Sequence, residues 1–407
     1  MILDSTDYEA DCRARLDELR AALIDLYAGV GADPSSPQDV ARRFGVNKTL
    51  TWNIARVVGG TDAMRTLQHV PGASAIQSLL GAFERDGAEP ANVERVRNAS
   101  RALDRTVERH FGDRATLDLI LDGISPDRGD HLELSRKLAY RGNSGLWGVQ
   151  SKARLMTAML APNAQDPSMI DAVLIRGYVA LRRLRSDIRW PIFQVRGWGS
   201  EGKMTDVNRW QPLEPIDGPD NGLPLLKRFS TVTPADVDAK RGARGMNYLL
   251  APGPVGNFGA VDCYMSDYAR AIASKYRTER DATGEFGATI SVPTERLVFD
   301  LIVHESLDFA LTPEVRAVAG IFMERTDDPD PDTQADIPVP QEVQKLPGRP
   351  PVVTTPSVPG YAGIVQYANE RMGWNGSDFR GCRFEMAYPP LGSTILLRFK
   401  LPPPPAK

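Results

Sequence analysis

SPQDVARRFGVNKTLTWNIARVV, residues 36–58, is the stretch that decides the N-terminal fold. Its capping and turn residues predict two short helices joined by a tight turn. Ser36 is a suitable N-cap, and Pro37 at the first helical position needs no hydrogen-bond partner for its nitrogen. Gly45 tolerates the positive φ that a turn between close helices requires, and Asn47 can cap the second helix. The segment therefore predicts a helical hairpin.

Each predicted helix has one apolar face. In the second helix, Leu50, Ile54 and Val57 recur at i, i+4 and i+7, which places them on one buried stripe. In the first helix, Val40, Ala41 and Phe44 point inward. Because the two helices must cross closely, a small side chain is needed four residues before the turn glycine, and Ala41 supplies it.

The remaining side chains of this segment are mostly polar and basic. Those expected outside the buried stripe of the second helix can contact base edges or phosphates, and two arginines of the first helix can contact phosphates. Residues 37–65 hold five basic and two acidic side chains, which gives a local charge of +3 on a chain whose net charge is −3. The predicted DNA-contacting residues are Arg42, Arg43, Lys48, Thr49, Thr51, Trp52, Asn53 and Arg56.

In these features residues 36–58 resemble the helix-turn-helix of bacterial transcriptional regulators. The resemblance implies that the second helix enters the major groove of double-stranded DNA, and that the protein binds as a homodimer. Thr51 departs from the pattern, because that family usually has an aliphatic residue there. Trp52 either faces DNA or packs against a following helix. The alternative is a helix pair that serves packing alone.

The flanking sequence predicts an all-helical region over residues 1–112. Leucines at positions 16, 19, 23 and 26, followed by Val30, form one buried stripe. Further helices are expected at 61–68, 73–85 and 90–110, with Thr61 and Pro90 as starts. Residues 113–189 also have apolar side chains at helical spacing, notably SKARLMTAML and SMIDAVLIRGYVALRRLR, and predict a helical connecting region.

After residue 189 the sequence pattern changes from helical spacing to strand-like segments, which predicts an α+β domain over 190–407. Strands are expected at 190–198, 288–292, 296–304 and 315–324, and in the segments CRFEMAYP and STILLRFKL. The third and fourth of these should form one antiparallel hairpin, and the last two a second. YMSDYARAIASKYRTER predicts a helix, and the acidic, proline-rich residues 325–360 predict a long surface loop. The whole chain is therefore expected to be α+β.

Composition and the pattern of the N-terminus bear on where in the cell the protein is located. Three widely separated cysteines, Cys12, Cys263 and Cys382, make a disulfide framework or a cysteine-rich zinc site improbable. The N-terminus lacks the pattern of a signal peptide, and no apolar run approaches the roughly 18–20 residues of a membrane helix. These features predict a soluble cytoplasmic protein that has no membrane contact.

Catalytic and metal-binding patterns are weak. The four histidines do not have the spacing of metal ligands. His304 beside Glu305 follows a strand and could act as a general base, but the sequence offers it no partner. Asp300 lies in mid-strand, where alternation predicts solvent. We therefore predict no catalytic residue, no metal and no cofactor.

Three hypotheses follow. The first is a sequence-specific transcriptional regulator, whose C-terminal domain oligomerises or senses a small-molecule effector. The second is an enzyme of unknown reaction with its site in the C-terminal domain, marked by a pocket where His304 meets a carboxylate or metal. The third is a self-assembling or scaffolding protein that uses its loop and hairpins for protein contacts.

Overall fold

The computed structural model divides the chain into two compact units, Met1–Leu132 and Glu133–Lys407. It describes residues 5–124, 128–195, 210–214, 224–233, 236–242, 245–279, 282–320 and 335–405. The sequence predicted boundaries at 112 and 189 instead. The predicted fold class, α+β with N-terminal helices and a C-terminal sheet region, is confirmed.

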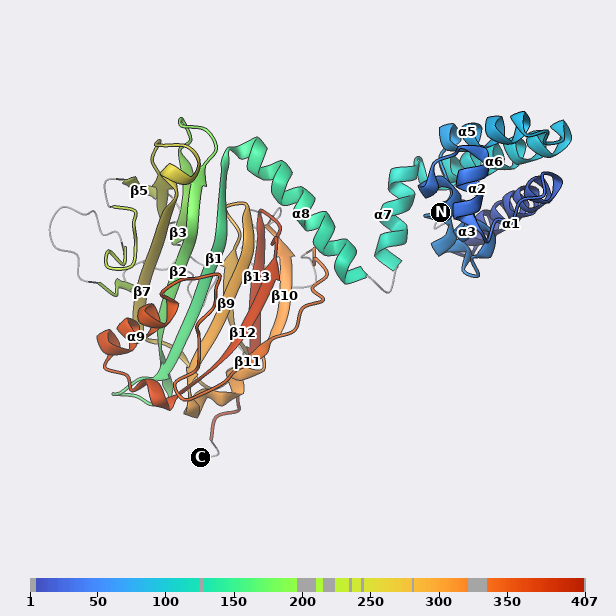
Figure 1. Ribbon diagram of the computed structural model, residues 1–407. Helices are drawn as coiled ribbons and strands as arrows, with labels where there is room; N and C mark the ends of the chain where they lie inside the picture. The colour runs from blue at the N-terminus through green and yellow to red at the C-terminus, as the bar shows by residue number, and fades with distance from the viewer. Residues whose placement is uncertain are drawn as a thin grey trace. The chain divides into compact units, whose positions relative to one another are not determined.

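The first unit is helical (Figure 1). Its helices follow the predicted stops closely, because prolines, glycines and capping residues fix where a helix can begin and end. None of the helices in the described ranges is both long and apolar enough to cross a bilayer. The helices are α1 (Ser5–Gly29), α2 (Pro37–Phe44), α3 (Lys48–Gly59), α4 (Ala63–Leu67), α5 (Ala73–Arg85), α6 (Pro90–Phe111) and α7 (Arg114–Ile124).

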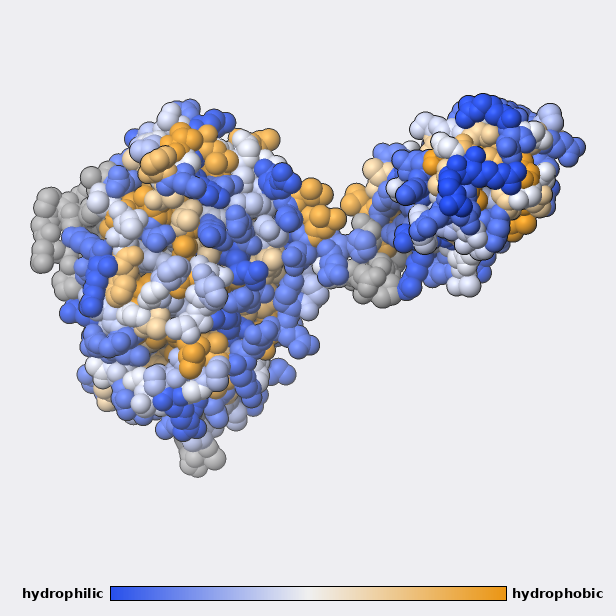
Figure 2. Space-filling view, viewed as in Figure 1, coloured by the Kyte–Doolittle hydropathy of each residue, from blue (hydrophilic) through white to orange (hydrophobic). Residues whose placement is uncertain are grey.

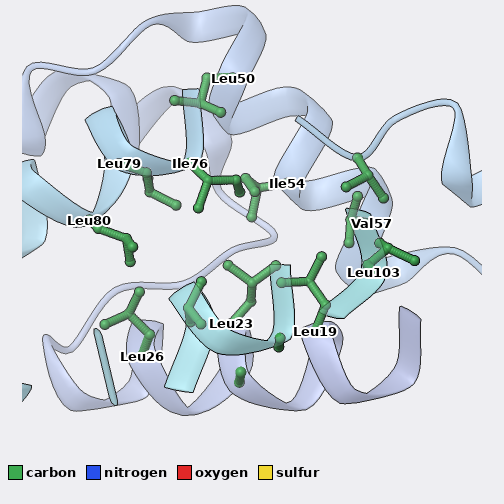
Figure 3. Close-up of a cluster of buried hydrophobic side chains, with 14 of the residues drawn as sticks. Leu19, Leu23, Leu26, Leu50, Ile54, Val57, Ile76, Leu79, Leu80 and Leu103 are labelled. Atoms are coloured by element: carbon green, nitrogen blue, oxygen red, sulfur yellow. The ribbon is translucent and has the colours of Figure 1, made fainter. Parts of the chain in front are cut away.

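One core holds these helices together. The predicted α1 stripe is buried, and its leucines meet side chains from α3, α5 and α6 (Figure 3). Tyr27 and Phe44 both contact the Phe83 ring, with centroids 4.9 and 4.2 Å away. Helix α3 therefore has its apolar side fixed in a core built by the whole unit.

The second unit is built on a seven-stranded sheet in the order β11-β12-β9-β1-β2-β7-β4. Strands β1 and β9 run parallel, and every other neighbouring pair is antiparallel. Helix α8 (Arg128–Trp147) leads into β1. The strands are β1 (Val149–Pro162), β2 (Met169–Arg183), β4 (Gln211–Pro212), β7 (Val261–Ser274), β9 (Thr294–His304), β11 (Gln344–Leu346) and β12 (Phe379–Ala387).

Both faces of this sheet are covered. On one face, Leu155, Ile175 and Val298 pack against helix α9 (Tyr361–Met372). The other face carries two three-stranded sheets. The first comprises β10 (Glu314–Ala319), β13 (Ser393–Lys400) and β8 (Thr283–Thr289), and the second β3 (Trp190–Val195), β6 (Gly245–Leu250) and β5 (Val237–Gly242).

The predicted helical connecting region is wrong beyond residue 147. Residues 149–162 and 169–183 form the long antiparallel strands β1 and β2. Every residue from Ala153 to Ala161 is buried, because both faces of the sheet are covered. Such a strand is a continuous apolar run without alternation, and periodicity cannot distinguish it from a buried helix.

Four further predictions are corrected. The segment expected to be a helix begins at Tyr264, and its residues up to Ser274 belong to strand β7, which spans 261–274. Strand β9 does not pair with β10, and β12 does not pair with β13, because each pair is divided between the large sheet and a small one. These four strands begin within three residues of the expected positions, whereas their long-range partners differ from those expected. The strand expected at 288–292 is also misplaced, because β8 ends at Thr289. Of the predicted loop, residues 335–360 include the short strand β11, and 321–334 lie outside the described residues.

Asp300 is buried, not directed to solvent as alternation predicted. Its side chain lies on the α9 side of the sheet. It is buried because both faces of β9 are covered. Arg383 donates to both its carboxylate oxygens over 2.8 Å, and the Tyr361 hydroxyl donates to Oδ2 over 2.9 Å. Thr157 hydrogen-bonds the same hydroxyl. This buried network ties α9 and β12 to the middle of the large sheet.

Candidate nucleic-acid interface

Helices α2 and α3 are joined by a turn with the predicted geometry. Pro37 stands in the first turn of α2, and Gly45 ends the helix with φ of 66° in the left-handed region. The Asn47 side chain accepts a 2.7 Å hydrogen bond from the Thr49 amide and caps α3. Ser36 caps α2 differently from the prediction, because its carbonyl oxygen, and not its side chain, accepts the first helical amides.

The far end of α3 is held by an arginine that sequence analysis did not single out. Arg20 of α1 donates from Nε to the Val57 carbonyl over 2.8 Å and from Nη2 to the Gly60 carbonyl over 2.5 Å. These carbonyls lack helical partners at a C-terminus, and a cation there is favoured by the helix dipole. Arg20 lies on another helix, far from α3 in sequence, so this role is visible only in the folded structure.

The inward face of α3 includes Thr51, which corrects one predicted DNA contact. Thr51 is 1% exposed, and its hydroxyl donates to the Lys48 carbonyl over 2.9 Å. It thus occupies the packing position where the resembled family has an aliphatic residue. Because the Thr51 hydroxyl is hydrogen-bonded within its own helix, a threonine can occupy this buried position without another partner. Thr51 cannot contact DNA without unfolding of α3.

The outward face of α3 has basic, polar and aromatic side chains. Lys48, Thr49 and Arg56 are exposed, and Asn53 is half-buried. Trp52 is 48% exposed, which leaves both of its predicted orientations open. The surface over α2 and α3 is mostly hydrophilic (Figure 2). Among the described residues, no carboxylate forms an ion pair with a basic side chain of α3.

The two arginines of α2 differ in what they contact. Arg42 is 82% exposed, and among the described residues its one ion pair is with Asp39 one turn away, a pairing that solvent weakens. Arg43 instead bridges three elements. Its guanidinium donates to the carbonyls of Val30 and Gly31 after α1, and to Asp86 after α5. Arg42 is therefore available to a phosphate, whereas Arg43 is engaged in holding α2 in place.

The C-terminal half of α3 contains one basic side chain, Arg56. His69, which follows α4, lies close enough to Arg56 to feel its charge. Burial and, secondarily, the Arg56 charge lower the pKa of His69. Because both effects disfavour a second cation there, His69 is neutral near pH 7, and Arg56 carries the charge of this corner.

The second unit contains His304, the residue on which the enzyme hypothesis depends. The imidazole of His304 interacts with Ser306, with Nδ1 and Oγ 2.9 Å apart, and it meets the Phe379 ring edge-on. Its neighbour Glu305 pairs with Arg380. Across the described ranges, no three side chains of the metal-binding types form a group that could hold an ion. In these ranges, His304 does not meet the carboxylate or metal that would have marked the enzyme hypothesis.

Comparison with known proteins adds little. No protein-family model matches the chain, and no curated protein matches it. One solved structure, from Parabacteroides distasonis and described as a candidate protease, aligns over 63% of this chain at 9% identity. Its TM-score is 0.25, and the alignment spans 41% of its own length. A similarity of this size carries no argument about fold or activity.

Proposed function

We propose that this protein is a sequence-specific DNA-binding transcriptional regulator, with α2 and α3 acting as a helix-turn-helix. The observation that carries the proposal is the division of α3 into a buried apolar side and an exposed side with Lys48, Thr49 and Arg56. Both ends of the helix are held, by Asn47 and by Arg20. A rigid helix with a basic outward side is what major-groove docking requires.

The side chains divide by role. Lys48 and Thr49 lie in the first turn of α3, where a recognition helix meets base edges, and lysine can pair with guanine. Asn53 lies one turn further and can pair with adenine. Arg42 and Arg56 contact phosphates, which position the protein without specifying sequence. Trp52 packs against the sugar-phosphate backbone or the thymine methyl group.

The rest of the proposal concerns assembly and compartment. We infer a homodimer, because helix-turn-helix proteins usually bind two half-sites about one helical turn apart. The second unit would supply the dimer contacts or an effector site. Cys12, Cys263 and Cys382 are buried free thiols, which suits a reducing compartment, and we propose the cytoplasm.

Selection from a random DNA pool by the full-length protein tests this proposal. We expect enrichment of one sequence, and a palindrome if the protein binds as a dimer. Recovery of only unrelated sequences, with affinity that depends on salt alone, would contradict sequence-specific regulation.

Single variants then locate the interface. Lys48→Ala should cost about 1–3 kcal/mol of binding to the selected site and relax specificity at one position. Arg56→Ala should weaken binding to all sequences and flatten the salt dependence by about one charge. Arg296→Ala, an exposed arginine of the second unit, is the matched control and should change neither quantity. If all three variants have the same DNA affinity and salt dependence, α3 is not part of the DNA interface.

A further inference from the structure

Two arginines lie together in the core of the second unit. In the β1–β2 ladder Arg154 is opposite Tyr178 and Arg176 is opposite Met156, so the arginines are diagonal neighbours on one face. That face is covered by the β3-β6-β5 sheet, whose Phe193 meets Arg154. Arg154 is 5% exposed, and the Arg176 side chain is 12% exposed. Guanidinium groups are rarely buried to this extent without matching acids.

The charges of this cluster do not balance. Arg176 forms an ion pair with Asp267 of β7, which is itself buried. Among the described residues, no carboxylate pairs with Arg154. Its Nη1 donates only to the carbonyls of Leu155 and Gly177, over 2.6 and 3.2 Å. Two guanidinium groups and one carboxylate leave one surplus positive charge in the core.

Hydrogen-bonding capacity is also left over. The Nε atoms of Arg154 and Arg176 are both buried, and neither has a hydrogen-bond partner. The Arg154 guanidinium lies beside two rings that contact each other, 4.8 Å from the Tyr178 centroid and 5.0 Å from that of Phe193, with the ring centroids 5.1 Å apart. Burial, together with the neighbouring charge of Arg154, lowers the pKa of Arg176 to about 10. Arg154, which has no acid partner among the described residues, is a buried cation that is costly unless an anion joins it.

We propose that Arg154 and Arg176 form the binding site for an oxyanion, the carboxylate or phosphate group of a small molecule. Guanidinium groups bind such groups through paired, charge-assisted hydrogen bonds, and two Nε–H donors are unused here. Tyr178 and Phe193, which contact the Arg154 guanidinium, border this position. Because Asp267 already neutralises one arginine, the site has one positive charge to offer.

Thermal unfolding of the full chain without DNA tests the site, so its failure is separate from failure of DNA binding. Inorganic phosphate and sodium acetate are titrated against sodium chloride at equal ionic strength. One of the two oxyanions should raise Tm saturably, by about 5 °C or more at a hundredfold excess over Kd. The more effective anion identifies the phosphate or the carboxylate class. If neither differs from chloride, the proposal is wrong.

Arg154→Met removes the surplus charge and keeps the bulk. We expect its Tm without oxyanion to equal or exceed that of the wild type, and its response to oxyanion to vanish. Arg189→Met, at an exposed arginine paired with Asp238, is the control and should keep the full response. An unchanged response in Arg154→Met would overturn the site. If that variant does not fold, calorimetric titration of the wild type decides, since absence of saturable binding has the same meaning.

Discussion

The arginines of helices α2 and α3 and the buried arginines in the strands of the large sheet differ in what surrounds them. Arg42 and Arg56 stand in solvent, where water stabilises their charge whether or not a partner is present. Arg383 is buried and depends on Asp300, whereas Arg154 is buried without any acid among the described residues. Solvated arginines can exchange a weak partner for a phosphate at little cost, but buried ones must be neutralised in place.

The largest expected effect is at Arg383. Arg383→Met leaves the Asp300 carboxylate buried without its two 2.8 Å hydrogen bonds. We expect the free energy of unfolding of the second unit to fall by about 3–5 kcal/mol, because an unpaired buried charge bears its full desolvation cost. Urea denaturation monitored by circular dichroism measures the change.

A double variant separates charge from packing. Replacing both partners, Asp300→Leu with Arg383→Met, should recover much of the stability that Arg383→Met loses, since no charge is then stranded. Should the double variant be less stable than Arg383→Met, packing around this pair, and not charge, dominates its contribution.

The two neighbouring arginines of α2 offer a smaller and paired test. Arg43→Ala removes hydrogen bonds to Val30, Gly31 and Asp86 and should lower the free energy of unfolding of the first unit by about 1–2 kcal/mol. Arg42→Ala removes only an exposed pair and should change it by less than about 0.5 kcal/mol.

DNA affinity should distinguish the same pair in the opposite direction. Arg42→Ala should weaken binding to all sequences and reduce its salt dependence, while Arg43→Ala should affect binding only through stability. Gel-shift titrations at several salt concentrations measure both. Loss of salt dependence in Arg43→Ala alone would reverse the assigned roles.

The first unit could be predicted from sequence and much of the second could not, for a physical reason. Pro37, Gly45 and Asn47 act within a few residues of where they stand, so local rules fixed α2, the turn and the start of α3. The partners of β9 and β12 come from distant parts of the chain. Strands covered on both faces lose the alternation that would identify them, so β1 and β2 were predicted to be helices.

The candidate site divides in the same way. The outward position of Lys48 and Thr49 followed from helical periodicity, and that of Trp52 was left open. Thr51 was misplaced because its polar type outweighed its position, although the helix can satisfy a threonine hydroxyl internally. The role of Arg20 depends on contact between elements and had no local signal.

A modest effect is expected at Thr51. Thr51→Val keeps the buried shape and removes a hydroxyl that bonds only to the Lys48 carbonyl. The free energy of unfolding should change by less than about 1 kcal/mol, and DNA affinity should not change. Thr49→Ala, at the exposed neighbour, should alter affinity without altering stability. An affinity change in Thr51→Val that exceeds that of Thr49→Ala would place Thr51 at the interface after all.

The smallest expected effect is the pH dependence that His69 contributes. Burial and Arg56 lower the pKa of His69 below its usual 6.5, so near that pH the unfolded chain binds protons that the folded chain does not. Stability from this group is therefore complete above the unfolded pKa and is lost as pH falls through the folded pKa. Urea denaturation between about pH 7.5 and 5.5 should show a steeper loss for the wild type than for His69→Asn. A phosphate at Arg56 would offset the charge that disfavours the imidazolium, so wild-type DNA affinity should rise as pH falls across that range. If His69→Asn keeps the same pH dependence of affinity, Arg56 does not meet a phosphate.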